Sequence, residues 1–60
     1  MFQIGDAVVH PVRGAGIVTD IEKLKRRDGS QSYYRIELID QPRTSLMVPV
    51  GSARDHWIFS

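Results

Sequence analysis

Hydrophobic and polar residues alternate along much of this chain, in short stretches rich in Val, Ile and Tyr. Such alternation is typical of β-strands with one buried and one solvated face. It is clearest in residues 32–39 and 44–50, which we expect to form the third and fourth strands. The residues assigned to their buried faces are Tyr34, Ile36, Leu38, Leu46, Val48 and Val50. The residues assigned to their opposite faces are Tyr33, Arg35, Glu37, Ser45, Met47 and Pro49.

Two further strands are expected upstream, over residues 7–10 and residues 16–26. In the longer one, alternation predicts that one face holds Ile17, Thr19 and Ile21, opposite Val18, Asp20 and Glu22. Asp28-Gly29 separates this strand from the next. Because Asp-Gly favours the positive φ angles of a tight hairpin, the second and third strands should pair antiparallel.

The C-terminal part of the chain carries weaker signals. Ser52 is a candidate N-cap for one helical turn, with Asp55 reaching back in a weak capping box. Residues 56–59 form either a last short strand or an apolar tail packed on the sheet. Several short strands joined by turns, with no long helix, predict an all-β fold: a small Tudor- or SH3-like bent antiparallel sheet, or partly open barrel, of four to five strands.

Size and composition narrow the possible functions. The chain has 60 residues, enough for one domain over residues 1–60, and a chain this short buries roughly 60% of its unfolded surface. It has no cysteine and only two histidines, His10 and His56, so we expect neither disulfides nor a metal site. Eight Lys and Arg against seven Asp and Glu give a net charge of +1, which argues against nucleic-acid binding as the function of this chain on its own.

No arrangement typical of catalysis or of membrane insertion is recognisable. No serine lies in a GxSxG elbow, no motif orients either histidine, and the glycines of Gly14-Ala15-Gly16 precede a strand pattern instead of a phosphate-binding helix. We expect His10 to be a strand-end residue bonded to the backbone. The N-terminus lacks signal-peptide features and no apolar run approaches about 20 residues. We therefore expect a cytoplasmic, soluble, non-enzymatic module without cofactor, small-molecule substrate or membrane partner.

The best candidates for binding lie on the long hairpin. The basic cluster Lys23, Lys25, Arg26 and Arg27 could contact an acidic partner, although Asp20, Glu22 and Asp28 interleave with it and a solvated tip is an equal alternative. Exposed aromatic and Met side chains are enriched at interfaces, and alternation exposes Tyr33 and Met47. A long hairpin in a small sheet also leaves an edge that a partner strand can join.

About fifty residues resemble a known family. Residues 2–18, F-Q-I-G-D-A-V-V-H-P-V-R-G-A-G-I-V, look like the opening of the CarD/CdnL family of bacterial transcription regulators. They are also similar to the RNA-polymerase-interacting domain of the transcription-repair coupling factor. The resemblance continues through Ile21-Glu22, Tyr33-Tyr34 and L-M-V-P-V at residues 46–50.

The resemblance implies a Tudor-like β domain that binds the β subunit of RNA polymerase by adding a polymerase strand to its sheet edge. Carried over by position, the partner-binding residues are Lys23, Leu24, Lys25 and Arg26, with Met47 on the neighbouring strand. Regulators of this family support the promoter open complex. They contact DNA through a second, helical domain, so DNA is only an indirect partner here.

This sequence departs from the family pattern in two places. We expect residues 1–60 to hold the family's N-terminal domain alone, with its C-terminal helical domain absent from them, and residues 54–59 replace a strand that in the family resembles Gly-Leu-Arg. Met47 occupies a position that is basic in some members, so a contact there is expected to be apolar. Two other functions stay open at this point: the equivalent domain of a transcription-repair coupling factor, and a nucleic-acid-binding SH3-like barrel.

Overall fold

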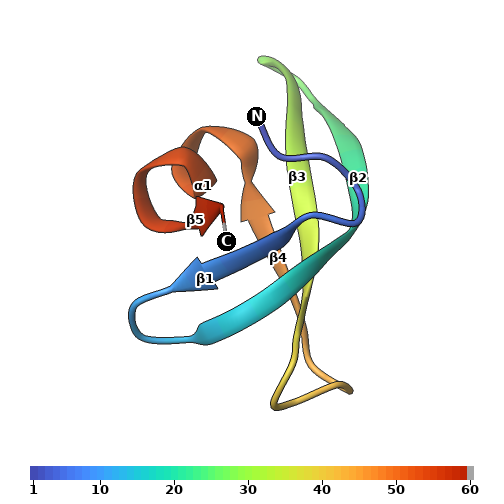
Figure 1. The fold of residues 1–60 in the computed structure, drawn as a ribbon. Helices are drawn as coiled ribbons and strands as arrows, with labels where there is room; N and C mark the ends of the chain where they lie inside the picture. The colour runs from blue at the N-terminus through green and yellow to red at the C-terminus, as the bar shows by residue number, and fades with distance from the viewer. Residues whose placement is uncertain (60) are drawn as a thin grey trace.

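The chain folds into a single five-stranded antiparallel sheet with one short helix. The computed structural model describes residues 1–59, and its strand order is β4-β3-β2-β1-β5 (Figure 1). The elements are β1 (Ala7–His10), β2 (Gly14–Arg26), β3 (Gly29–Leu38), β4 (Ser45–Pro49), α1 (Val50–His56) and β5 (Ile58–Phe59). The predicted all-β fold, a bent antiparallel sheet of four to five strands, is confirmed.

The long β2 strand holds the sheet together, because it pairs with β3 along its length and with β1 near its start. Its pairing with β1 runs from His10 opposite Gly14 to Ala7 opposite Ile17. β5 closes the other side of β1 with only two residue pairs. Of the two possibilities for residues 56–59, the short strand is therefore the correct one for Ile58 and Phe59.

A β-bulge corrects the predicted faces of β2. The register shifts between Val18, which pairs with Ile36, and Asp20, which pairs with Arg35. The extra residue, Thr19, reverses the alternation. Ile21 consequently pairs with the buried Tyr34 and shares the inner face with Val18, whereas simple alternation had separated them.

The hairpin between β2 and β3 also differs in detail from the expectation. The two strands do pair antiparallel, but Arg26 faces Gly29, so Arg27 and Asp28 form the turn. Among the described residues only glycines have positive φ, and Gly29 has φ 128°. Within this turn only Gly29, the first residue of β3, has the positive φ that glycine permits, whereas Asp28 has a negative φ.

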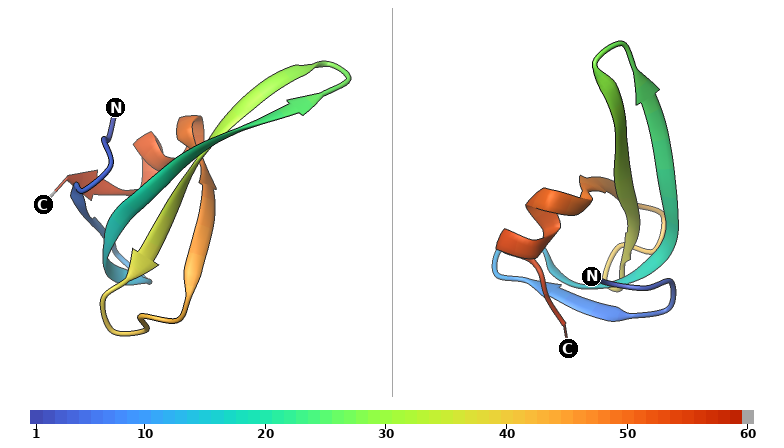
Figure 2. Two further views of the ribbon diagram at one scale, coloured as in Figure 1. Left: turned by 90° about the vertical axis from the view of Figure 1, so that its right-hand side faces the viewer. Right: turned by 90° about the horizontal axis from the view of Figure 1, so that it is seen from above.

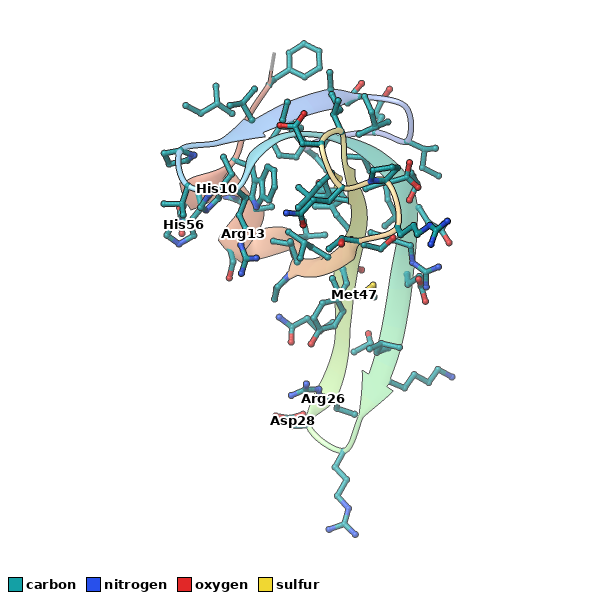
Figure 3. The ribbon with its side chains drawn as sticks, turned by 90° about the horizontal axis from the view of Figure 1, so that it is seen from below. His10, Arg13, Arg26, Asp28, Met47 and His56 are labelled. Atoms are coloured by element: carbon teal, nitrogen blue, oxygen red, sulfur yellow. The ribbon has the colours of Figure 1, made fainter. Side chains whose placement is uncertain are left out.

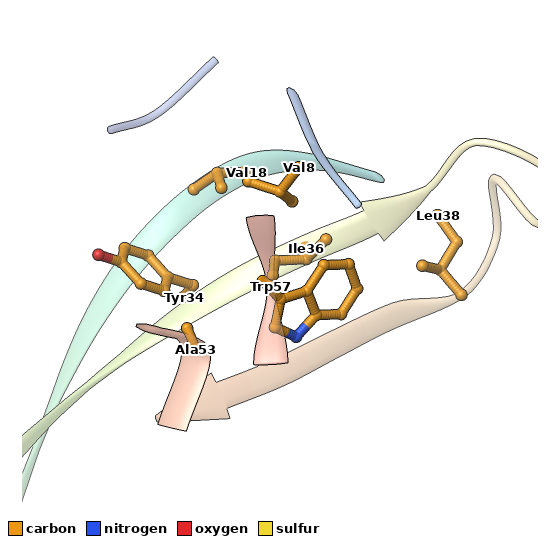
Figure 4. Close-up of a cluster of buried hydrophobic side chains, with 7 residues drawn as sticks. All are labelled: Val8, Val18, Tyr34, Ile36, Leu38, Ala53 and Trp57. Atoms are coloured by element: carbon orange, nitrogen blue, oxygen red, sulfur yellow. The ribbon is translucent and has the colours of Figure 1, made fainter. Parts of the chain in front are cut away.

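The core lies on the inner face of the curved sheet, under α1 (Figure 4). The buried side chains are Val8, Val18, Tyr34, Ile36, Leu38, Ala53 and Trp57. The inner-face residues predicted for β3 are all in this set, and Leu46, Val48 and Val50 pack against it. A hydrogen bond from the Phe2 N–H to the Tyr34 hydroxyl, 2.9 Å long, ties the N-terminal segment to the same core.

The predicted N-cap at Ser52 is wrong. The helix already begins at Val50, and the residue before it, Pro49, is extended with φ −56° and ψ 137° and provides no side-chain cap. Ser52 is exposed inside the helix. Burial of Val50, Ala53 and Trp57, which recur at helical spacing, fixes the helix in place of a cap.

We expect Gly16→Ala to destabilise the domain by about 1–3 kcal/mol, the usual cost of overpacking a core. An added Cβ would lie 2.6 Å from Ile36 Cγ2 and 3.1 Å from the Glu37 carbonyl oxygen. Gly51→Ala is the matched control, because Gly51 lies in α1 and a Cβ added there has no atom within 4 Å. Since alanine favours a helix over glycine, this substitution should stabilise the domain by about 0.5–1 kcal/mol. Urea unfolding followed by circular dichroism measures both; equal midpoints for the two variants would contradict this packing.

Candidate strand-docking edge

The outer half of β2 has one edge that no other strand covers. β1 pairs with β2 only as far as Ile17, and backbone bonds from Gly5 and Asp6 reach one residue further, to Val18. From Asp20 onward β2 has only β3 beside it, and from Lys23 to Ser32 the two strands project beyond β4 as a long two-stranded arm (Figure 2). We call the uncovered edge of β2, residues 20–26, the free margin; its outer part belongs to the arm. No other segment within residues 1–59 pairs with it.

The backbone geometry shows which groups of the free margin point outward. Val18 N–H donates to the Asp6 carbonyl at 3.0 Å and its carbonyl accepts from Gly5 N–H at 2.7 Å, so its polar groups face away from β3. Residues of an antiparallel strand alternate in this respect, and the bulge inserts one extra residue. Ile21, Lys23 and Lys25 therefore direct their N–H and C=O groups outward, while the residues between them bond to β3.

The four residues predicted to bind a partner lie together on this margin, but their side chains divide between two faces. Lys23 and Lys25 share the inner face with Tyr34, as the register shows. Leu24 and Arg26 lie on the outer face, where Leu24 is 45% exposed. The segment therefore combines two outward backbone positions, two lysines on one face, and an apolar and a cationic side chain on the other.

Met47 lies on the same outer face, as predicted, and is 43% exposed. Its strand, however, is not adjacent to β2: Met47 pairs with Arg35 of β3, and β3 separates β4 from the free margin. Figure 3 shows Arg26 at the tip of the arm and Met47 nearer the body of the sheet. A partner that contacts both must span the outer face of β3.

Three polar contacts, two hydrogen bonds and one ion pair, organise that outer face. Arg26 donates a hydrogen bond of 3.2 Å to the Tyr33 hydroxyl, which itself donates to Gln31 Oε1 at 3.4 Å. Glu22 and Arg35 form an ion pair across the two strands. Exposed ion pairs contribute little stability. Their effect here is that the Glu22 carboxylate is already engaged with Arg35 and is directed away from the lysines of the inner face.

Sequence reasoning missed these cross-strand contacts because they depend on the bulge. Without it, Glu22 would have shared a face with Val18, as predicted, and not with Arg35. The charge pattern alone suggested that Asp20 and Glu22 weaken the basic cluster. In the structure both carboxylates have local partners, the Ile21 N–H for Asp20 and the Arg35 guanidinium for Glu22.

The histidine singled out in the sequence, His10, has a structural role at the end of β1. His10 Nδ1 accepts hydrogen bonds from the N–H groups of Val12 and Arg13, at 3.0 and 3.1 Å, which confirms the expected backbone-bonded strand end. Its ring packs against Trp57 with centroids 4.9 Å apart. Within residues 1–59 no three His, Cys, Asp or Glu side chains gather where they could hold a metal ion.

A hollow of about 630 Å³ lies between the N-terminal segment and the C-terminal elements. Aromatic side chains, among them Phe2 and Trp57, and one cation, Arg54, line it. Neither Met47 nor any residue of the free margin is part of this lining. The hollow and the free margin are therefore separate surfaces.

Taken together, the sheet and its margin define a class: a small β module that presents an open strand edge. The chain belongs to the family of CarD-like/TRCF RID domains, whose model matches residues 2–58. This is a family of transcription-related, RNA-polymerase-interacting domains, so the resemblance seen in the sequence is confirmed.

One curated relative gives the family assignment further support. The chain is 43% identical over 51 residues to a Bacillus subtilis (strain 168) protein described as "Putative transcription factor YdeB". That alignment covers 85% of this chain but 33% of the relative, so the chain spans about a third of the relative's length. No solved structure matches the chain. In the part of the chain that the structure describes, no helix is long and apolar enough to cross a membrane.

Proposed function

We propose that this chain is the polymerase-docking module of a CarD-like transcription regulator, and that it binds the β subunit of bacterial RNA polymerase. A strand of that subunit joins the free margin, and Met47 makes an apolar contact on the outer face. The observation that carries the proposal is the uncovered β2 edge with its outward backbone groups at Lys23 and Lys25. Backbone pairing supplies affinity in such complexes, and flanking side chains supply specificity.

The side chains near the margin suit a protein partner. Leu24, Tyr33 and Met47 give the outer face an apolar and aromatic character, and Arg26 orients Tyr33. Tyr, Met and Arg are enriched at protein interfaces. We propose that the module acts without catalysis or cofactor, in the cytoplasm, and that it supports the promoter open complex while other parts of a longer protein contact DNA.

The transcription-repair coupling factor is the nearest alternative parent. The relative described above is named as a transcription factor, and this favours a regulator over a repair translocase. The docking edge is the same in both cases, because the free margin is formed by residues 20–26 and does not depend on the rest of the parent protein.

We expect Lys25→Glu and Met47→Asp each to weaken binding to the polymerase β subunit by about tenfold, or about 1.4 kcal/mol. Binding is measured with the isolated lobe of that subunit that carries the pairing strand, here called the β-subunit lobe. The first substitution reverses a charge beside the β-subunit strand that joins the free margin, which we call the guest strand. The second places a carboxylate in an apolar contact. Titration of the ¹⁵N-labelled domain with the lobe, followed by NMR, measures affinity and maps the site. The largest shifts should fall at Lys23, Leu24, Lys25 and Arg26, with a further set around Met47.

Matched controls come from the loop between β3 and β4. Arg43→Glu and Ile39→Asp make equivalent changes at exposed positions remote from the free margin, and both should bind like the wild type. If wild-type protein does not bind the lobe, the proposed function is wrong. If it binds but Lys25→Glu and Met47→Asp do so equally well, the function stands and the site assignment fails.

A further inference from the structure

The first outward donor of the free margin already has a partner within the chain. Asp20 Oδ1 accepts a hydrogen bond of 2.8 Å from the N–H of Ile21. Ile21 is the first residue after the bulge whose backbone groups point away from β3. A guest strand approaching this edge therefore meets a carboxylate at Ile21 and an available N–H only from Lys23 onward.

The bulge places Asp20 in position to do this. Thr19 donates from Oγ1 to the Arg35 carbonyl oxygen at 3.2 Å, which holds the extra residue against β3. Asp20 follows immediately, is exposed, and turns its side chain toward the edge. Short Asp side chains commonly compete for backbone N–H groups in this way.

The part of the β2 edge whose backbone groups already have partners within the chain continues directly from the part paired with β1. Val18 has both backbone groups bonded to the segment that precedes β1, and the next outward position, Ile21, has its N–H bonded to Asp20. The edge of β2 therefore changes from internally satisfied to open between Ile21 and Lys23. Native proteins protect edges with charges and bulges at such points.

We propose that Asp20 is the stop that ends the docking edge and sets the register of the guest strand. The guest, a strand of the polymerase β subunit, then pairs with Lys23 and Lys25 and does not reach the Ile21 N–H. This inference rests on the proposed function and adds to it a positioning residue outside the segment Lys23 to Arg26. A one-residue slip would move every guest side chain to the opposite face, so a fixed stop has consequences for specificity.

The stop is tested first in the free protein, by amide hydrogen exchange resolved by NMR. After correction for intrinsic rates, the Ile21 amide should exchange at least about tenfold more slowly than those of Lys23 and Lys25. Asp20→Ala should remove this difference. Asp20→Asn keeps an amide oxygen as acceptor and should retain much of it. Equal exchange at Ile21 in wild type and Asp20→Ala would overturn the stop whether or not polymerase binds.

The register is tested in the complex with the β-subunit lobe. In wild type, binding should slow exchange at Lys23 and Lys25 by at least about tenfold and leave Ile21 unchanged. In Asp20→Ala the guest should also protect Ile21, while Asp20→Asn should follow the wild type. A merely structural role for Asp20 would change the affinity without moving this boundary of protection.

The outcomes separate the two proposals. Absence of any binding by the wild type overturns the proposed function, and with it the guest strand. If binding slows Ile21 exchange further in the wild type, or leaves it unchanged in Asp20→Ala, the proposed function stands and Asp20 is not the stop.

Discussion

Replacing Trp57 with alanine is expected to leave the domain largely unfolded at 25 °C. Truncating a buried Trp costs about 3–5 kcal/mol, and a core in a chain of this size rarely supplies more than about 3–5 kcal/mol in total. Trp57 is 5% exposed and stands at the junction of α1 and β5. It contacts the core on one side and the His10 ring on another, so its loss detaches the helix from the sheet.

The adjacent residue provides the control for this substitution. Ile58 is 69% exposed, and Ile58→Ala should change stability by no more than about 0.5 kcal/mol, as is usual for surface positions. Trp57 is the chain's single tryptophan, so circular dichroism and amide dispersion in NMR spectra are the suitable measurements. A Trp57→Ala protein with the wild-type urea midpoint would show that α1 does not depend on this side chain.

Lys23→Pro is expected to abolish most of the docking while leaving the domain folded. Proline lacks the N–H that the guest strand needs and places its ring in the guest's path. A lost hydrogen bond and an unsatisfied guest carbonyl together cost roughly 2–4 kcal/mol, or about 30- to 900-fold in affinity. The native ladder is spared because the Lys23 N–H points away from β3, and proline is tolerated at such edge positions.

Leu24→Pro is the matched comparison, one residue along the same strand. The Leu24 N–H bonds to β3, so proline there removes a native ladder bond and should destabilise the arm itself. Calorimetric titration with the β-subunit lobe and thermal unfolding distinguish the two effects. Should Lys23→Pro bind as tightly as the wild type, docking would have to depend on side chains of the outer face and not on backbone pairing.

The sequence predicted the strands well because their burial pattern is regular. β3 and β4 follow simple alternation, and their inner-face residues, such as Tyr34 and Leu46, pack in the core or against it. The exposed position of Met47 followed from the same rule. The fold class, the antiparallel hairpin and a free edge on the arm could therefore be foreseen.

What the sequence did not reveal depends on non-local geometry. The bulge at Thr19 arises from pairing with Arg35, a residue far along the chain, and it reassigned the faces of Ile21 and Glu22. The helix start was missed because packing of the half-buried Val50 and the buried Ala53 against the core outweighs the capping preference of Ser52. The bond from Ile21 to Asp20 follows from the bulge and had no separate signal in the sequence.

The pairing of β5 with β1 bears on the order in which the module is assembled. Val8 lies opposite Phe59, so this contact joins the two ends of the sequence, whereas the turn between β2 and β3 joins immediate neighbours. Local hairpins form quickly, and distant pairings must first overcome the entropy of closing a long loop. During synthesis the arm can form while the ribosome is still adding residues. The body that supports it becomes stable only after Trp57 and β5 have been added.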